Sequence, residues 1–462
     1  MSKPNVIFIT TDQQRYDAVG ANGNPHIQTP TLDRMIANGV SLDNCYVQNA
    51  VCMPSRASIW TGRYPQNHGV TTNGIQLPKT EVTMAHTFLQ NGYHTANIGK
   101  LHFVPHKGAG RDHTINSVVY AGYGYEMNLV SEAPGPYPDD YLSWVQETAP
   151  QHIDRVRYRL PHALGPESLF DMWDFQAPES VHYTTWITDK AVEFLTTYRD
   201  PRPFFLSLGP FYPHPPLNPP REYVDLYDMD TLPLPNQHPE DMARSPFKEV
   251  SPDIWRRMKA YYYALVTQVD RSLQRLLDAL EASGQANNTI IVFMSDHGEM
   301  LGDHGRTSKG PTNYEEEIHV PCVFYAPWLL PRGRRVAGLV EAIDIFPTLA
   351  SLCGIRLDDG VKGRDWSAVL RGESEVTRDD VLIEHKDTRT GIHVKTLRTE
   401  RYKYFYYADG REVLYDLCDD PREVFDRAGD PAYADVIAEL RKRLLTRLFE
   451  IQDDLPPKTH DW

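Results

Sequence analysis

The sequence predicts an α/β protein whose central sheet is mostly parallel. Short apolar runs rich in Val, Ile or Phe alternate with longer segments of helical periodicity, as in sheets covered by helices. Each run is bounded by turn residues and ends abruptly in polar side chains, which is typical of a buried strand. The runs are 6–10, 94–98, 204–208 and 289–294.

Three segments between and after these runs have the apolar spacing of helices. In the longest, apolar side chains recur every three or four residues from Met258 to Leu280, and the pattern stops before Gly284. The predicted helices are 82–91, 184–198 and 254–282.

Two regions are expected to be mostly irregular. Residues 109–180 are rich in Tyr, Pro, His and Trp without clear periodicity, which predicts a long insertion. That insertion either lines a pocket mouth or is a surface connection. The proline-rich stretch 211–251 is expected to contain little regular structure.

The pattern changes again after residues 372–377 and predicts a smaller α+β subdomain. Asp409-Gly410 is a hairpin signal, and a helix is expected over 433–451. The predicted strands are 381–385, 391–397, 402–407 and 413–417. We therefore divide the chain into a main domain, 1–372, and a C-terminal subdomain, 373–462, with a short antiparallel sheet and a terminal helix.

Composition limits the function classes. The 462 residues carry a net charge of −15, which argues against nucleic acid and acidic membranes as partners. No apolar stretch is long enough to span a membrane, and the run 5–9 is too short for a signal-peptide core. Five scattered cysteines suggest reduced thiols and a cytoplasmic location, with Cys45, Cys322, Cys353 and Cys418 expected to be buried. Homo-oligomerisation is left open.

Polar side chains follow all four predicted strands. Because ligands bind at the carboxyl ends of strands in such sheets, these clusters are expected to converge on one site. The side chains are Asp12 and Gln13, Lys100 and His102, His214, and Asp296 and His297.

The most informative stretch is Val51-Cys52-Met53-Pro54-Ser55-Arg56-Ala57-Ser58. No second Cys or His lies at zinc-ligand spacing, and nothing pairs with Cys52 at a disulfide spacing. Residues 54–64 are expected to be helical, with Pro54 in the first turn and Gly62 near the end. Cys52 would then lie at a helix N-terminus, which favours an anion, so a nucleophile there indicates hydrolysis of a charged ester.

Cys52, Pro54, Ser55 and Arg56, followed by Thr61-Gly62-Arg63, resemble the C-x-P-S-R signature of the sulfatases. The resemblance covers most of the chain and implies an alkaline-phosphatase-like fold, a mostly parallel mixed sheet sandwiched by helices. It also implies that Cys52 is oxidised to formylglycine after translation, by a maturation enzyme that is a partner of this chain.

The same resemblance implies one divalent metal ion. Its ligands would be Asp12, Gln13, the modified Cys52, Asp296 and His297. Gln13 departs from the commoner Asp, so this site carries one negative charge fewer. Calcium is the family habit, manganese and magnesium stay open, and the nitrogen of His297 slightly favours manganese.

The remaining catalytic residues are also implied by motif. Gly-Lys-Leu-His at Lys100 and His102 resembles the family's Gly-Lys-x-His element, and His214 and Lys309 match its second histidine and lysine. Taken singly, each is more often a solvated lysine or a structural histidine. In this order, together with Cys52, they form a consistent set.

The implied chemistry is attack on sulfur by one hydroxyl of the hydrated aldehyde, giving a sulfo-enzyme that the second hydroxyl helps to release. Arg56, Lys100 and Lys309 would stabilise the sulfuryl oxygens, each contact contributing about 2–4 kcal/mol. His214, with Lys309, would protonate the leaving alcohol, and His102 would take the proton of the second hydroxyl.

The leading prediction is thus a sulfuric ester hydrolase acting on a sulfated sugar or a small organic or aryl sulfate. A phosphonate monoester or phosphodiester hydrolase of the same superfamily is the alternative, although those enzymes lack the Lys-x-His element. A non-catalytic metal- or glycan-binding protein is a third, and would be expected to have lost one of the motif residues. His385, Arg398 and Arg401 are further candidates for reaching the pocket.

Overall fold

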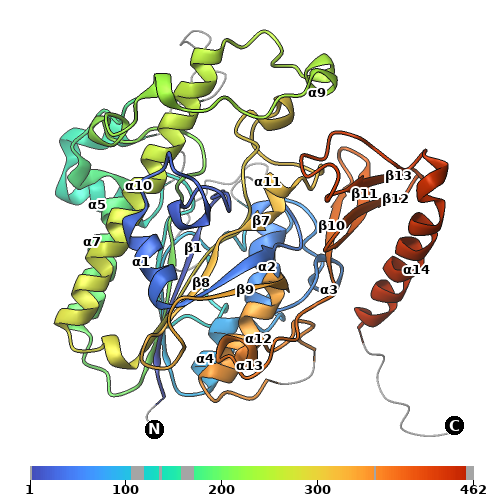
Figure 1. Cartoon of the computed structure of the whole chain (residues 1–462). Helices are drawn as coiled ribbons and strands as arrows, with labels where there is room; N and C mark the ends of the chain where they lie inside the picture. Colours follow the sequence, from blue (N-terminus) through green and yellow to red (C-terminus); the bar gives the residue numbers. More distant parts are fainter. Residues whose placement is uncertain (1–2, 106–118, 135–137, 158–170, 358–359, 454–462) are drawn as a thin grey trace, which may run out of the picture.

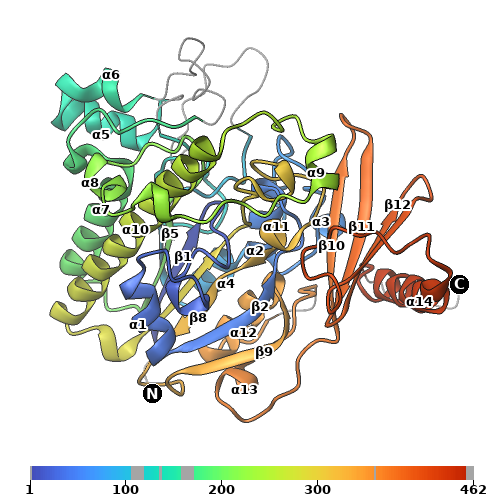
Figure 2. The same cartoon turned by 45° about the horizontal axis from the view of Figure 1, so that its top comes forward.

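The computed structural model describes residues 3–105, 119–134, 138–157, 171–357 and 360–453. Within these residues, a mixed nine-stranded sheet lies between two layers of helices. A four-stranded antiparallel sheet and the long helix α14 stand beside it, as Figures 1 and 2 show from two directions. The predicted fold class is therefore confirmed.

The main sheet has the order β4-β3-β5-β1-β6-β8-β2-β7, with β9 paired to β2. Strands β4, β3, β5, β1 and β6 run parallel, whereas β8 is antiparallel to both β6 and β2. The strands are β1 (Asn5–Thr11), β2 (Val40–Tyr46), β3 (His94–Gly99), β4 (Met127–Val130), β5 (Phe204–Gly209), β6 (Thr289–Ser295), β7 (His319–Val320), β8 (Cys322–Tyr325) and β9 (Arg334–Glu341).

The central strands are buried on both faces, which explains why they lack polar alternation in sequence. Along β1, Ile7 and Ile9 point into one apolar cluster, whereas Val6 and Phe8 point into another. Helices α1 (Pro30–Asn38), α7 (Tyr183–Thr197) and α10 (Pro252–Ala282) pack in the first cluster. Helices α2 (Cys52–Thr61), α4 (Met84–Gln90) and α12 (Ile345–Leu352) pack in the second, so the sheet is covered on both sides.

The predicted strands and long helices agree with β1, β3, β5, β6, α4, α7 and α10 to within two residues at each end. The remaining α-helices before residue 372 are short segments between the main elements. They are α3 (Pro65–His68), α5 (Asp140–Thr148), α6 (Ile153–Val156), α8 (Arg221–Val224), α9 (Pro239–Arg244), α11 (Glu315–Ile318) and α13 (Ser367–Leu370).

The prediction of irregular structure over 109–180 is only partly right. Part of that range lies outside the described residues, but the rest contains the edge strand β4 and helices α5 and α6. Strand β4 has only four residues, too few to show a period. A second correction concerns Cys418, which is exposed rather than buried, unlike Cys45, Cys322 and Cys353.

The predicted C-terminal strands and helix are present as β10 (Asp380–Asp387), β11 (Ile392–Thr399), β12 (Tyr402–Tyr407), β13 (Glu412–Asp416) and α14 (Ala434–Glu450). Buried charges join this part to the main sheet. Arg447 of α14 contacts Glu341 at 3.0 Å and donates to the Tyr64 hydroxyl at 2.7 Å. Arg378 pairs with Asp344 at 2.5 Å and with Glu341 at 3.0 Å. The domain boundary at residue 372 stays a prediction.

None of the helices in the described part of the chain combines the length and apolar character that crossing a membrane requires.

Gly209, at the carboxyl end of β5, lets the backbone of Lys100 approach closely. A Cβ atom there would lie 2.1 Å from the Lys100 carbonyl oxygen, which is backbone and cannot rotate away. Gly209→Ala is therefore expected to lower the free energy of unfolding by about 1–3 kcal/mol. Urea denaturation followed by circular dichroism measures this.

Gly429→Ala is the matched control, because a Cβ at Gly429 would meet nothing within 4 Å. That variant is expected to be neutral or more stable by about 0.4–1 kcal/mol. Equal losses in the two variants would contradict the close approach at Gly209.

Candidate active site

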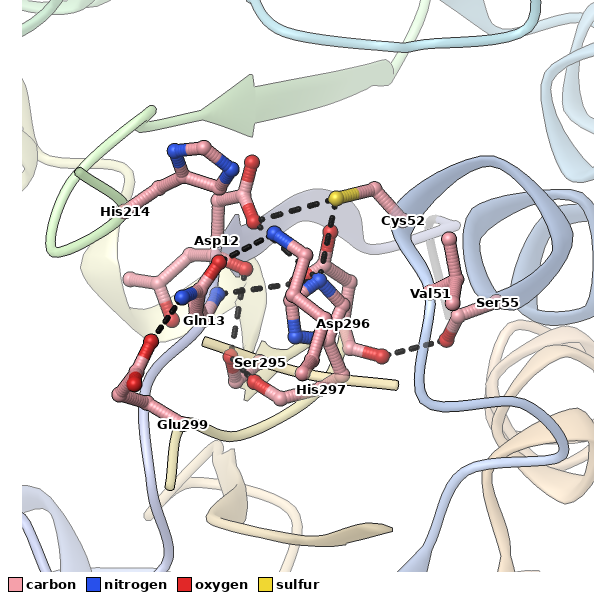
Figure 3. A network of polar contacts seen from close by, with 12 residues as sticks. Asp12, Gln13, Val51, Cys52, Ser55, His214, Ser295, Asp296, His297 and Glu299 are labelled. Carbon is pink, nitrogen blue, oxygen red and sulfur yellow. Dashed lines mark hydrogen bonds and ion pairs between the residues drawn. The ribbon is translucent and has the colours of Figure 1, made fainter. Parts of the chain in front are cut away.

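Parallel pairing brings the predicted polar clusters to one edge of the sheet. Thr11 is paired with Ser295, and Gly99 with Gly209, so the strands β1, β6, β3 and β5 end at the same level. Asp12, Asp296 and Lys100 are the next residues along three of these strands. Figure 3 shows Asp12, Asp296 and His297 around the Cys52 sulfur, with His214 beside Asp12.

Cys52 reaches this edge at the first residue of α2, two residues earlier than the helix predicted from sequence. Its preceding residue, Val51, is extended, and the Ser55 amide donates to the Val51 carbonyl at 3.0 Å. Gly62 ends the helix with a φ of 65°, and its amide donates to Ser58. Every residue of α2 is buried, which explains why the helix shows no one-sided apolar stripe.

Four side chains form a compact buried cluster suited to a metal ion. Cys52 Sγ lies 3.1 Å from His297 Nε2 and 3.6 Å from Asp12 Oδ1. His297 Nε2 lies 3.5 Å from Asp12 Oδ1 and 3.7 Å from Asp296 Oδ1. One ligand atom from each of the four lies within 4.8 Å of every other. Two buried carboxylates and an imidazole facing one point fit a divalent cation.

Gln13 lies at the same point in a left-handed conformation, with a φ of 70°. Its backbone amide donates to Asp296 Oδ1 at 3.1 Å, which holds the residue in the site. The Lys309 ammonium donates to the side-chain oxygen of Gln13, and the side-chain nitrogen of Gln13 donates to Glu299. The structure thus brings Gln13 and Lys309 together with Asp296.

Two cations balance the two carboxylates. Lys100 pairs with Asp12 Oδ2 at 2.5 Å, and Arg56 Nε pairs with Asp296 Oδ2 at 2.6 Å. Burial by itself raises the pKa of Asp12. The positive charges of Lys100 and Lys309, together with His214 and His297, more than offset this and hold that pKa well below its usual range. Asp12 is therefore ionised, as a metal ligand must be.

The Arg56 guanidinium forms hydrogen bonds with other groups of the protein. Besides Asp296, it donates to the Lys100 carbonyl at 3.0 Å, and its side chain has no exposed surface. Longer contacts of 3.4 and 3.5 Å reach the carbonyls of Thr10 and Thr11. These contacts orient Asp296 and the strand ends, and they do not by themselves test the predicted role of Arg56 on sulfuryl oxygens.

Two histidines each have Nδ1 against a backbone carbonyl, which places a proton on Nδ1 and leaves Nε2 as the other ring nitrogen. His297 Nδ1 donates to the Gly298 carbonyl at 2.9 Å, leaving Nε2 toward Cys52. His214 Nδ1 donates to the Pro215 carbonyl at 2.6 Å, leaving Nε2 free of that bond. Burial and the charge of Lys309 put the pKa of His214 well below its usual value.

The chain matches known proteins over almost its whole length. The model of the Sulfatase family matches residues 4–355, and that of the N-sulphoglucosamine sulphohydrolase C-terminal region matches residues 302–450. An arylsulfatase of Clostridium perfringens is 33% identical over 96% of this chain and 94% of its own length. The chain belongs to the sulfatase family.

Two further relatives extend the comparison. An N-acetylglucosamine-6-O-sulfatase of Bacteroides thetaiotaomicron is 26% identical, over 98% of this chain and 88% of its own. The crystal structure of a phosphonate monoester hydrolase of Agrobacterium radiobacter superposes with a TM-score of 0.85 at 26% identity. It covers 97% of this chain and 96% of that one. As a sulfatase, the protein is a sulfate ester hydrolase of the alkaline phosphatase superfamily.

The sequence did not reveal the polar residues that support this sulfatase site through hydrogen bonds. Glu132 accepts the backbone amides of Leu101, at 3.3 Å, and His102, at 2.9 Å. His102 is buried and left-handed, with a φ of 57°, so Glu132 braces the turn that follows Lys100. The Tyr120 hydroxyl also donates to Glu132. The general-base role of His102 stays a prediction.

Three more residues support the cluster of four side chains. Tyr262 donates to the Gln13 carbonyl at 2.7 Å, and Ser295 Oγ contacts the His297 carbonyl at 2.8 Å. Ser55 donates from α2 to the Asp296 carbonyl. Tyr262 lies 249 residues from Gln13 along the chain, and no local pattern signals such a long-range contact.

His68, near the site in sequence, donates to Ser58 Oγ at 3.0 Å, and burial lowers its pKa to about 3, so it is a neutral structural histidine. The other candidates from the sequence lie outside the cluster. Arg398 lies over the Tyr46 ring and beside Glu315, and Arg401 pairs with Asp416 on a half-exposed surface. His385 is buried in β10. The described contacts of these arginines do not join them to Cys52.

Replacing Arg56 would leave Asp296 buried without its nearest cation. Arg56→Met is expected to lower the free energy of unfolding of the metal-free protein by about 3–5 kcal/mol. Denaturant titration in the presence of a chelator measures the loss.

Arg221→Met is the control, since the pair between Arg221 and Asp225 is more than half exposed. Its loss should cost less than about 1 kcal/mol. If Arg56→Met were as mild as this control, the Arg56 pair would not be needed to keep Asp296 charged.

Proposed function

We propose that the protein cleaves a sulfate monoester with formylglycine at position 52 and one divalent metal ion held by Asp12, Gln13, Asp296 and His297. The observation that carries this proposal is the place of Cys52. Its sulfur lies at the start of a buried helix, 3.1 Å from His297 and 3.6 Å from Asp12. Calcium is the proposed ion, with manganese and magnesium as the alternatives.

Formylglycine and a bound metal ion would supply two things. Hydrated formylglycine would provide one hydroxyl to attack sulfur and a second for release of sulfate, and the bound metal would polarise the sulfuryl oxygens. A thiol cannot provide the second hydroxyl. The proposal therefore includes a formylglycine-generating maturation enzyme as a partner. The scattered cysteines support a cytoplasmic location for this protein as a further part of the proposal.

The chain's own residues orient and charge the site. Lys100 and Lys309 present ammonium groups at its floor, where they would neutralise a bound anion. The N-terminus of α2 adds backbone dipoles of the same sign. His214 is assigned to the leaving group, because its Nδ1 is occupied by Pro215 and Nε2 is the nitrogen left for proton transfer.

The substrate is proposed to be a sulfated sugar or a small organic or aryl sulfate. Relatives named as arylsulfatase and N-acetylglucosamine-6-O-sulfatase support both classes. The similarity to a phosphonate monoester hydrolase supports a second candidate, hydrolysis of phosphonate monoesters. Lys100 argues for sulfate, since Lys100 and His102 match the Gly-Lys-x-His element of the sulfatases.

Modification of Cys52 can be measured directly. Conversion of the thiol to the aldehyde lowers the mass by roughly 18 Da, a change in oxidation state at that cysteine. The protein co-expressed with a maturation enzyme is expected to show this shift on the peptide that contains Cys52. Cys52→Ala should lose about 10³-fold or more in kcat/KM without a change in melting temperature. Full activity with an unshifted Cys52 would exclude the mechanism.

A paired assay separates the two esterase functions. The modified, metal-loaded enzyme is expected to hydrolyse an aryl sulfate with a higher kcat/KM than the matching aryl phosphonate. Lys100→Ala should reduce sulfate turnover by about 10²–10³-fold, the loss of one charge-assisted contact in the transition state. A preference for phosphonate in the unsubstituted enzyme would favour the second candidate. If neither ester is hydrolysed, the third candidate, a non-catalytic metal- or glycan-binding protein, would be favoured.

A further inference from the structure

Glu299 connects two functional segments that are far apart in sequence. It lies two residues after His297, and only 4% of its surface is exposed. One carboxylate oxygen accepts the side-chain amide of Gln13. The other accepts the backbone amides of Leu301, at 3.0 Å, and Ser308. Figure 3 shows Glu299 on the side of Gln13 away from Cys52.

The partners of Gln13 decide which way its amide points. A glutamine amide has an oxygen that accepts and a nitrogen that donates. The Lys309 ammonium can only donate, and the Glu299 carboxylate accepts a hydrogen bond from each of its partners, the amides of Gln13, Leu301 and Ser308. Only one orientation satisfies both neighbours, with the oxygen toward Lys309 and the nitrogen toward Glu299. Without an acceptor at position 299, the reverse orientation would no longer be excluded.

The second oxygen of Glu299 fixes the segment that carries Lys309. Ser308 has a φ of 67°, a left-handed conformation that a serine rarely adopts. Its amide is held by Glu299, and its carbonyl accepts the Met300 amide at 2.9 Å. Lys309 is the next residue, so the Glu299 carboxylate also positions the backbone from which the Lys309 side chain extends to Gln13.

We propose that Glu299 is a positioning residue that turns the amide oxygen of Gln13 toward the metal site and holds Lys309 against it. This inference rests on the proposed function, in which Gln13 is a metal ligand. The hydrogen bonds of the Glu299 carboxylate go to Gln13, Leu301 and Ser308, and none of them goes to Asp12, Cys52, Asp296 or His297.

The variant that tests the amide contact is Glu299→Gln. Glu299 borders a cavity of about 150 Å³ that Tyr262 and Ser308 also line, so a shorter side chain would enlarge this space. Glutamine has nearly the same shape, and its oxygen can still accept from Leu301 and Ser308. Its nitrogen, however, would face the nitrogen of Gln13, donor against donor. Affinity of the metal-free protein for Mn²⁺ is expected to fall about 10- to 100-fold, the usual effect of losing such a supporting contact.

Exchanging the two residues separates orientation from charge. Gln13→Glu alone sets two carboxylates against each other. In the double variant Gln13→Glu/Glu299→Gln, the amide now at position 299 can donate to the carboxylate now at position 13, and the pair is restored with the same net charge as in the unsubstituted protein. The exchanged variant is expected to bind Mn²⁺ at least about tenfold more tightly than Gln13→Glu, although it has one carboxylate fewer. An effect of charge alone predicts the opposite order.

The measurement is titration of metal-free protein with Mn²⁺, counting the free ion by electron paramagnetic resonance. Glu317→Gln is the matched control, a buried glutamate of the neighbouring segment bonded to Thr312 and Tyr314 instead of Gln13. Its affinity should stay within about twofold of the unsubstituted protein. Melting temperatures verify that each variant is folded, and the comparison of the exchanged pair with Gln13→Glu does not need the Glu299→Gln single variant.

Two failures are distinguishable. Weaker binding by the exchanged pair than by Gln13→Glu, with normal binding by the unsubstituted protein, overturns the role of Glu299 alone. No binding of Mn²⁺ by the unsubstituted protein overturns the proposed metal site and this inference with it.

Discussion

The structure depends on keeping two carboxylates charged side by side in the interior. Asp12 and Asp296 have no exposed surface, and moving a lone carboxylate out of water costs several kcal/mol. Lys100 and Arg56 each pair with one of them, at 2.5 and 2.6 Å respectively. The parallel order of β3, β5, β1 and β6 brings Asp12, Asp296 and Lys100 to one edge, and Arg56 reaches them from α2. A divalent cation would complete the same balance of charge.

Three residues near these carboxylates have a strained backbone. Gln13, His102 and Ser308 are all left-handed, a conformation that costs a residue other than glycine on the order of 1–3 kcal/mol. In each case a buried carboxylate accepts the backbone amide of the left-handed residue. The carboxylates are Asp296, Glu132 and Glu299, respectively. Each bond helps to offset the strain, and each left-handed residue is, or adjoins, a proposed metal ligand or catalytic residue.

An acidic protein can still offer a site for an anion because charge acts locally at short range. The chain has a net charge of −15, yet Lys100, Lys309 and the N-terminus of α2 all face the Cys52 cluster. Burial strengthens these interactions because little water screens them. The positive charges also lower the pKa of Cys52, overcoming the opposite effects of burial and Asp12. The site thus favours a negative group at the position where an ester would react.

The sequence by itself determined the fold class, the main strands and the motif residues, because these are local features. Apolar runs ending in polar residues indicated β1, β3, β5 and β6, and the C-x-P-S-R stretch indicated the family and a helix from Pro54, two residues after the observed start at Cys52. Only the tertiary structure decided what supports the site. Glu299 accepts a hydrogen bond from Gln13, which lies 286 positions earlier in the sequence. Arg56 pairs with Asp296, which lies 240 positions later. Such contacts arise when distant strands end at one sheet edge, and no period or spacing along the chain encodes them.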